Sequence, residues 1–305
     1  MDTFDTMLSL GIKNKPDGLI ISDLKWKYLV RCVLRGENIM MIGPSGCGKT
    51  LSAKKVAEVL NRPFFKFNVG STQDARATLI GNTTYDKTIG TVFHKSQFVK
   101  AITTPNSIVL LDELTRGTHD CWNILMSPLD PTQRDLRLDE GSNGEVINVA
   151  DGVCFIATAN IGNEYTATKV LDKAISGRFP IKIEMESLDS DQLLDLFEVF
   201  FPTKTHHQLS VMRKLCDISE DIRLECKNED SNLSTALSSR SLVKMAELVM
   251  DGFTLEEIIE VSIFTEYPDD VGADSERTFV SQIVQKYFPV DVANPIVDPR
   301  KKKKS

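Results

Sequence analysis

Residues 43–50, with the sequence GPSGCGKT, combine glycines at both ends with a lysine next to a hydroxyl. The spacing fits G-x-x-x-x-G-K-[ST], in which glycines let backbone N–H groups turn inward around phosphate oxygens. An apolar run, residues 38–42, precedes the loop and is predicted to be a buried strand. Behind the loop, apolar residues recur at helical spacing between positions 53 and 60, so a helix is expected to begin near Lys49. Strand, glycine loop and helix start together predict a phosphate-binding loop.

The predicted loop supplies two side chains to a bound nucleotide. Lys49 is expected to reach the β- and γ-phosphates, and the Thr50 hydroxyl is expected to ligate Mg²⁺. The positive end of the helix adds to the attraction for phosphate. The stretch expected to touch the nucleotide comprises Gly43, Pro44, Ser45, Gly46, Cys47, Gly48, Lys49, Thr50 and Leu51. ATP and Mg²⁺ are therefore the predicted cofactors.

Polar side chains end two further apolar runs. Residues 107–111 lead into Asp112 and Glu113, and residues 152–159 lead into Asn160. A carboxylate at a strand end beside the loop can hold the water shell of Mg²⁺, which is the role predicted for Asp112. Glu113 has the reach to orient and deprotonate an attacking water, so the predicted reaction is hydrolysis. Asn160 could position the same water or contact the γ-phosphate.

The elements that must hold these side chains follow from the apolar patterns. Five runs are expected to be strands: residues 38–42, 63–69, 107–111, 152–159 and 180–185. Helical patterns separate several of them, including a stripe between Asp23 and Gly36, which favours a mainly parallel sheet covered on both faces. After the last strand only helical stripes remain, as far as Phe288. The sequence predicts an α/β fold with a smaller all-helical domain.

The predicted boundaries follow from these changes in pattern. They are residues 1–22 for an N-terminal segment, 23–186 for the α/β nucleotide-binding domain, 187–289 for the helical domain and 290–305 for a basic tail.

Composition narrows the class of protein. The 305 residues are 41% hydrophobic and 26% charged, as in globular proteins, and they suffice for one large and one small domain. No apolar run approaches the ~20 residues that a membrane helix needs, and the acidic start MDTFDTMLSLGIK does not resemble a secretory signal. Six scattered cysteines without a C-x-x-C pair are expected to be reduced thiols. A cytoplasmic protein without membrane contact is therefore predicted.

The charge distribution bears on nucleic acid as a partner. The net charge of −7 argues against a protein that coats nucleic acid. The last six residues, RKKKKS, contribute +5, so the rest of the chain carries −12. Such a run of basic residues is usually a solvated tail. Contact between this tail and nucleic acid is an alternative that the sequence does not favour.

Two arginines complete a pattern of motifs. Arg178 lies in an L-D-x-A-x-x-x-R-F segment just before the last predicted strand, and Arg240 lies in an S-x-R-S-L helix start. With the phosphate loop, the D-E strand and the strand-end asparagine, this order resembles the AAA+ ATPases. The stretches DELTRGTHDCWNILMSPLD, ATANIGNEYTATKVLDKAISGRF and SSRSLVKMAELVMDGFTLEEII resemble, more narrowly, the MoxR-like branch that includes CbbQ, NorQ, GvpN and CobS. The resemblance covers roughly residues 20–285.

The resemblance implies a P-loop AAA+ core with a helical lid domain and a role for each motif residue. Those roles are Walker A for Lys49 and Thr50, Walker B for Asp112 and Glu113, first sensor for Asn160, arginine finger for Arg178 and second sensor for Arg240. The resemblance further implies a homo-oligomeric ring, most often a hexamer, that remodels, activates or inserts metal into a protein client, for example one with a metal-adhesion domain.

Three further features correspond to positions of the MoxR-like branch. Arg116, in the D-E-L-T-R stretch, is a candidate for the subunit boundary, and a salt bridge at the sheet edge is an equally open role for it. Residues 134–149 alternate around Ser142-Asn143-Gly144, which predicts a β-hairpin. Residues 81–95 match a helical insert that faces the ring pore. Both segments are candidate surfaces for contact with a partner. An ordinary exposed loop is an equally open interpretation of each.

Other nucleotide-binding classes fit the sequence less well. An ABC-type ATPase would need an L-S-G-G-Q-like helix before the D-E strand, where this chain has FVKAITTPN. A small-molecule kinase would not need Glu113, Asn160, Arg178 and Arg240 in this order. An AAA+ nucleic-acid motor and a nucleotide-switched assembly factor remain as alternatives.

Overall fold

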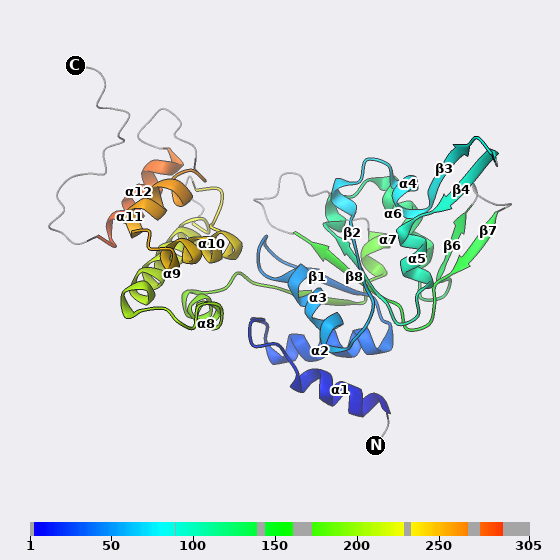
Figure 1. Cartoon of the computed structure of the whole chain (residues 1–305), viewed down its shortest axis with the longest axis horizontal. Helices are drawn as coiled ribbons and strands as arrows, with labels where there is room; N and C mark the ends of the chain where they lie inside the picture. The colour runs from blue at the N-terminus through cyan, green and yellow to red at the C-terminus, as the bar shows by residue number, and fades with distance from the viewer. Residues whose placement is uncertain are drawn as a thin grey trace, which may run out of the picture. The chain divides into compact units, whose positions relative to one another are not determined.

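The computed structural model describes residues 3–88, 90–138, 144–160, 173–228, 233–267 and 275–288. The chain divides into two compact units, residues 1–187 and residues 188–305 (Figure 1). The first unit contains every strand of the described part, and the second is helical.

The first unit is built on a five-stranded parallel sheet of order β2-β5-β8-β1-β9. Its strands are β1 (Ile39–Ile42), β2 (Phe64–Asn68), β5 (Ile108–Asp112), β8 (Cys154–Ala159) and β9 (Ile181–Glu184). All residues of β5 and β8 are buried, because helices cover both faces of the central strands. The predicted parallel sheet and its five strands are confirmed.

Helices lie on both faces of this sheet (Figure 1). On one face, α2 (Asp23–Arg35) and α3 (Lys49–Val59) pack against the odd residues of β1, such as Met41. On the other face, Met40 joins a core with α4 (Ala75–Leu79), α5 (Gln97–Thr103) and α6 (His119–Leu129). The start of α3 at Lys49 is the one predicted from the loop.

Two short elements complete the edges of the first unit. Helix α7 (Lys173–Gly177) leads into β9. Helix α1 (Thr3–Lys13) packs on α2, where Trp26 Nε1 donates a hydrogen bond to Gly11 O at 3.0 Å. A Cβ at Gly11 would lie 2.7 Å from Val30 Cγ1, so the two helices approach closely through this glycine.

Two β-hairpins extend from the first unit. Strands β6 (Asp135–Leu138) and β7 (Glu145–Asn148) pair antiparallel, which confirms the hairpin predicted over 134–149; Ser142 and Asn143 of its turn lie outside the described residues. The helical insert expected over 81–95 is wrong. This segment is a second hairpin of β3 (Gly81–Asp86) and β4 (Gly90–Lys95), because threonines and aromatic residues on alternating positions favour strands.

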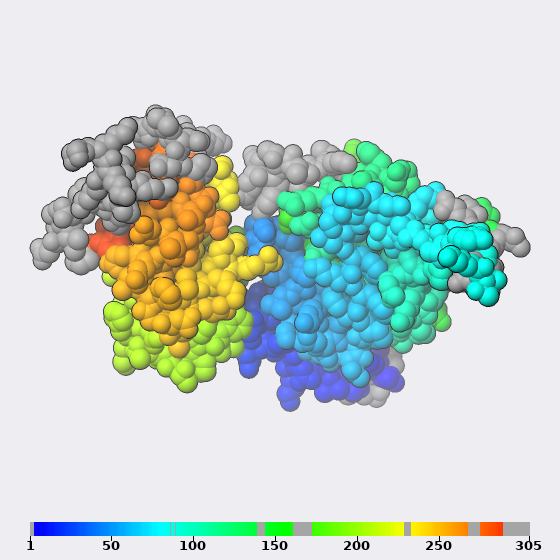
Figure 2. All heavy atoms as spheres, turned by 45° about the horizontal axis from the view of Figure 1, so that its top comes forward, coloured from blue at the N-terminus to red at the C-terminus, as the bar shows by residue number. Residues whose placement is uncertain are grey.

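The hairpins lie side by side and present an aromatic side chain. Lys95 Nζ on β4 lies 2.8 Å from Glu145 Oε1 on β7, an ion pair that links the two hairpins. The β3–β4 hairpin stands out on the surface of the first unit (Figure 2, cyan), and Tyr85 within it is 76% exposed.

The second unit consists of helices in its described part. They are α8 (Ser190–Phe200), α9 (His206–Glu225), α10 (Ser239–Met250), α11 (Leu255–Ile258), the π-helical turn η3 (Ile259–Ile263) and α12 (Glu276–Gln285). Their core includes Phe197, Leu215 and Met245. Thr254 and Glu257 form a capping box at the start of α11. Within the residues described, no helix is both long and apolar enough to cross a membrane.

Candidate nucleotide-binding site

The loop between β1 and α3 is held against the neighbouring strands. Gly43 N donates a hydrogen bond to Ala159 O at 3.1 Å, at the end of β8. A Cβ on Gly43 would lie 2.1 Å from Met185 O, so the loop can approach the segment after β9 only with glycine here. Gly48, at φ +89°, has open space around it, so its backbone conformation rather than a contact favours glycine.

Lys49 lies inside the loop that precedes it. The residue is 7% exposed, and its Nζ donates hydrogen bonds to Gly43 O at 2.8 Å and Pro44 O at 2.6 Å. Burial lowers the pKa of the Lys49 ammonium from its usual value, and neighbouring groups including Cys47 and Asp112 oppose this shift. The ammonium therefore lies at the loop backbone, where phosphate oxygens could replace the two carbonyl acceptors.

Asp112 accepts hydrogen bonds from three side chains at the end of β5. Thr158 Oγ1 and Lys66 Nζ donate to its carboxylate at 2.5 Å and 2.7 Å, and Thr50 Oγ1 lies 3.2 Å from Oδ1. Burial would raise the pKa of this carboxyl group, but the bonds from Lys66, Thr158 and Thr50 outweigh it and hold the pKa below its usual value.

The two predicted Mg²⁺ ligands, Thr50 and Asp112, are thus adjacent. A hydroxyl and an ionised carboxylate next to a phosphate-binding loop form the oxygen donor set that suits Mg²⁺. The residues present therefore fit the ion. In the described part of the chain, no group of three or more His, Cys, Asp or Glu side chains could hold a metal, and all six cysteines are free.

Glu113 leaves β5 in a left-handed conformation, with φ +57°. Its backbone N–H donates to Thr158 Oγ1 at 2.9 Å, and its Oε1 lies 3.5 Å from Arg116 Nη1. A Cβ on Gly70 would lie only 2.9 Å from Glu113 Oε2, so the carboxylate packs against that glycine. Arg116, a candidate for the subunit boundary, pairs with Glu113 of its own chain, which is the salt bridge left open above.

The strand order explains how these side chains meet. Strand β8 lies between β5 and β1, and Ala159 pairs in register with Ile42, the residue before the loop. Asn160, which follows Ala159 and is 8% exposed, therefore lies between the loop and the Asp112 end of the sheet. Lys49, Asp112, Glu113 and Asn160 come together at the carboxyl ends of three parallel strands, as the sequence predicts.

Arg178 lies at the opposite end of the sheet. Strands β1 and β9 run in register from Ile39↔Ile181 to Ile42↔Glu184, so Arg178 precedes one strand while the loop follows the other. Its Nε and Nη1 donate to Met126 O and Ala174 O, both at 2.8 Å, and Nη2 lies 3.3 Å from Asp130 Oδ2. Arg178 is thus not brought to the loop of its own chain.

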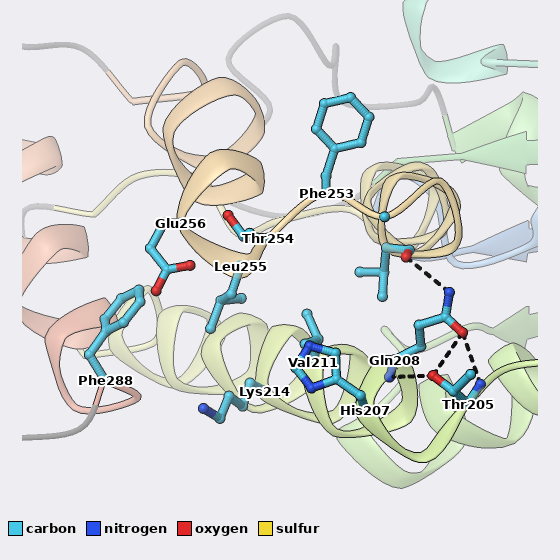
Figure 3. Close-up of a pocket in the computed structure, with 12 residues that line it drawn as sticks. Thr205, His207, Gln208, Val211, Lys214, Phe253, Thr254, Leu255, Glu256 and Phe288 are labelled. Atoms are coloured by element: carbon cyan, nitrogen blue, oxygen red, sulfur yellow. Dashed lines mark hydrogen bonds between the residues drawn. The ribbon is translucent and has the colours of Figure 1, made fainter.

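Arg240 belongs to the second unit, in the first turn of α10, where it is exposed. The second unit also contains a groove of about 450 Å³ between α9 and the start of α11, lined by Val211, Phe253, Leu255 and Phe288 among others (Figure 3). The groove contains none of the predicted nucleotide-binding residues, so it is a separate feature of the helical unit.

Three residues of the site were not identified from the sequence. Thr158 is a hydroxyl in an otherwise apolar buried strand, and Lys66 is a charge in the run PFFKFNV. Each is a polar residue within an otherwise apolar run, and this departure could have marked it as a candidate site residue. Gly70 gave no signal, because its contact with Glu113 depends on two distant segments of the chain.

Thr158 serves both acidic residues, so its replacement has a defined expected effect. Thr158→Val removes one hydroxyl while keeping the shape, and it leaves the Asp112 carboxylate and the Glu113 N–H each short of a partner. Because Thr158 is buried, we expect a loss of about 1–3 kcal/mol in the free energy of unfolding. Thr158→Ser, which keeps the hydroxyl, should lose less of the free energy of unfolding, as measured by urea denaturation. A Val variant at least as stable as the Ser variant would contradict this role.

Comparison with known families gives two adjacent matches. Residues 38–179 match the AAA domain of the dynein-related subfamily, and residues 202–284 match the CbbQ/NirQ/NorQ C-terminal domain. The chain is 28% identical over 230 residues to the putative chaperone BssE of Thauera aromatica, covering 75% of each chain. It is 29% identical to an uncharacterised protein of Staphylococcus saprophyticus, covering 77% of this chain and 86% of the relative.

Two larger proteins share this region. Mitochondrial Lon protease homologue 1 of Dictyostelium discoideum is 28% identical across 75% of this chain, which corresponds to 24% of the relative. Among solved structures, closed-state Hsp104 with ATPγS and FITC-casein matches with a TM-score of 0.51 and 15% identity over 87% of this chain. The chain spans about half of that Hsp104 chain, 48%, and this likeness concerns the fold alone.

The two family matches lie on the two units, the AAA domain on the parallel sheet and the CbbQ/NirQ/NorQ domain on the helices. The order of domains is the one that the motifs indicated. The chain belongs to the MoxR-like branch of the AAA+ ATPases.

Proposed function

We propose that this protein is a ring-forming ATPase that couples Mg²⁺-dependent ATP hydrolysis to the remodelling, activation or metal-cofactor insertion of a partner protein. AAA+ proteins are generally ATPases and typically assemble into oligomeric rings. The observation that carries the proposal is the meeting of a phosphate-binding loop with Asp112, Glu113 and Asn160 at one edge of the sheet.

Binding is the first step assigned to these residues. The backbone N–H groups of residues 45–51 and the Lys49 ammonium would take the phosphates of ATP. Thr50 and Asp112 would hold Mg²⁺, which supplies positive charge against the phosphate oxygens when bound. Their adjacency, with Thr50 Oγ1 3.2 Å from Asp112 Oδ1, supports this pairing.

Hydrolysis is assigned to Glu113 and Asn160. The Glu113 carboxylate would take a proton from the attacking water, and Asn160 would orient that water or contact the γ-phosphate. The ion pair with Arg116 holds the Glu113 carboxylate toward that side chain as long as it persists. We therefore expect Glu113 to leave Arg116 when the site is engaged.

Two arginines that lie away from the loop are also proposed to contact a nucleotide. Arg178 would act as a finger on the nucleotide of a neighbouring subunit, which its place at the far end of the sheet supports. Arg240, exposed at the start of α10, would act as the second sensor of the helical unit.

A protein client is favoured over nucleic acid. A relative covering three quarters of the chain bears the name putative chaperone, and the net charge is −7. The β3–β4 hairpin with exposed Tyr85 and the β6–β7 hairpin are the surfaces proposed for client contact.

A substrate-trapping experiment tests the proposed coupling. Glu113→Gln should bind ATP without hydrolysing it and so retain a native partner, identified by mass spectrometry and then purified. The purified partner should stimulate ATP turnover of the wild type and should stay bound to Glu113→Gln only with ATP and Mg²⁺. Stimulation by DNA or RNA, with no response to the partner, would instead support the nucleic-acid motor.

The basic tail has an expected effect of its own. Deleting residues 300–305 removes RKKKKS, which contains no apolar side chain to bury, so basal ATP turnover and assembly should be unchanged. If the tail binds nucleic acid, the affinity of the full chain for single-stranded DNA should fall steeply as salt rises and vanish on deletion. Basal turnover that collapses after deletion would show that the tail is part of the folded enzyme.

A further inference from the structure

The Asp112 carboxylate already has a cationic partner in this chain. Lys66 Nζ lies 2.7 Å from Asp112 Oδ2, within the distance of a strong charge-assisted hydrogen bond. Asp112 is the proposed Mg²⁺ ligand, and its other oxygen, Oδ1, accepts from Thr158 at 2.5 Å. Lys66 and Thr158 therefore bind different oxygens of the carboxylate. Thr50 Oγ1 lies 3.3 Å from Oδ2, the oxygen that Lys66 binds.

The strand register accounts for this contact. Strands β2 and β5 pair so that Asn68 is opposite Asp112 and Lys66 is opposite Leu110. Residues opposite one another in a parallel pair point to the same face, so Lys66, Leu110 and Asp112 share the face that α3 covers. Lys66 thus reaches Asp112 diagonally, from the same face that presents Thr50.

The same position leaves Lys66 able to move away. Strand β2 is the edge of the sheet, and the Lys66 side chain is 46% exposed, whereas that of Asp112 is 12% exposed. A lysine ammonium on a flexible four-carbon stem can turn to water at little cost from an edge strand. A buried carboxylate cannot follow it, and without a cation it would lie nearly desolvated.

We propose that Lys66 is a displaceable cation that neutralises Asp112 in the nucleotide-free site and must yield to Mg²⁺ when Mg–ATP binds. This inference rests on the proposed function, because it concerns the ion site of the same nucleotide pocket. A monovalent ammonium and a divalent ion repel each other across one carboxylate. Lys66 consequently sets the Mg²⁺ concentration at which the site fills.

Equilibrium binding of a fluorescent ADP analogue, titrated with MgCl₂, measures this competition. In Lys66→Met, the half-saturating Mg²⁺ concentration should fall about two- to fivefold, the size expected for loss of a partly exposed ion pair. Lys66→Arg, which keeps the charge, should stay at or above the wild-type value. Lys100→Met, an exposed lysine on α5, carries the same change of net charge and should match the wild type.

Thermal unfolding in EDTA without nucleotide gives an independent readout. Lys66→Met should melt below the wild type, because Asp112 loses its counter-charge, and Mg²⁺ with nucleotide should close most of that difference. An unchanged or higher Mg²⁺ requirement in Lys66→Met, with the wild type binding nucleotide normally, overturns the inference alone. A wild-type chain that binds no nucleotide at any Mg²⁺ concentration overturns the proposed function and this inference with it.

Discussion

Lys49→Ala is expected to abolish nucleotide binding, and Glu113→Gln is expected to keep binding while turnover falls by about 10²–10⁴-fold. Lys49 places its ammonium at the loop backbone, 2.8 Å from Gly43 O and 2.6 Å from Pro44 O, so its removal takes away the cation nearest the phosphate position. The amide introduced by Glu113→Gln would keep the shape of the side chain but could not take a proton from water.

The two variants separate binding from chemistry. Affinity for a fluorescent ATP analogue and steady-state phosphate release are to be measured for both, in the same buffer with Mg²⁺. Lys54→Ala and Glu58→Gln, on the exposed side of α3, are matched controls and should behave as the wild type. Near-normal phosphate release by Glu113→Gln would contradict the role of Glu113 as general base. Tight nucleotide binding by Lys49→Ala would contradict the role of Lys49 in phosphate binding.

The parallel sheet and the nucleotide edge could be predicted from the sequence for a physical reason. Central strands of a parallel sheet are buried on both faces, so β5 and β8 appear as continuous apolar runs that end in the polar residues Asp112 and Asn160. The carboxyl ends of such strands lie at one edge, and the phosphate loop marks that edge. Local patterns were therefore sufficient to predict that Asp112, Glu113 and Asn160 lie at the same edge of the sheet as the loop.

Contacts between distant segments could not be predicted in this way. The ion pair of Lys66 with Asp112 depends on the pairing register of β2 and β5, which no local pattern encodes. The segment 81–95 shows a different kind of error, because the resemblance indicated a helical insert where the structure has a β-hairpin. Threonine and aromatic residues alternate in this hairpin, a pattern typical of strands.

Arg178→Ala is expected to reduce ATP turnover by about 10³–10⁵-fold, the range known for arginine fingers, through the active site of a neighbouring subunit. Arg178 cannot serve the loop of its own chain, because the two lie at opposite ends of the paired strands β1 and β9. Its guanidinium is bonded to Met126 O, Ala174 O and Asp130 of its own chain, and one or more of these bonds must be exchanged for phosphate contacts.

Mixing two inactive variants decides whether Arg178 acts across a subunit boundary. Arg178→Ala subunits keep an intact loop, and Lys49→Ala subunits keep an intact arginine, so turnover should reappear when the two co-assemble. Light scattering should show a nucleotide-dependent oligomer, with a hexamer as the expected size. Recovery in the mixture would also show that Arg178→Ala subunits are folded, despite the lost bond to Asp130.

The matched control replaces the donor subunit by the double variant Lys49→Ala/Arg178→Ala, which has neither loop lysine nor arginine to offer. It should co-assemble equally well and restore nothing, so any recovered turnover in the first mixture is attributable to one guanidinium. If the arginine only braces its own subunit through Asp130, both mixtures should stay inactive in spite of co-assembly. A strictly monomeric protein with full ATP turnover would refute the trans assignment outright, because Arg178 would then have no neighbouring nucleotide to reach.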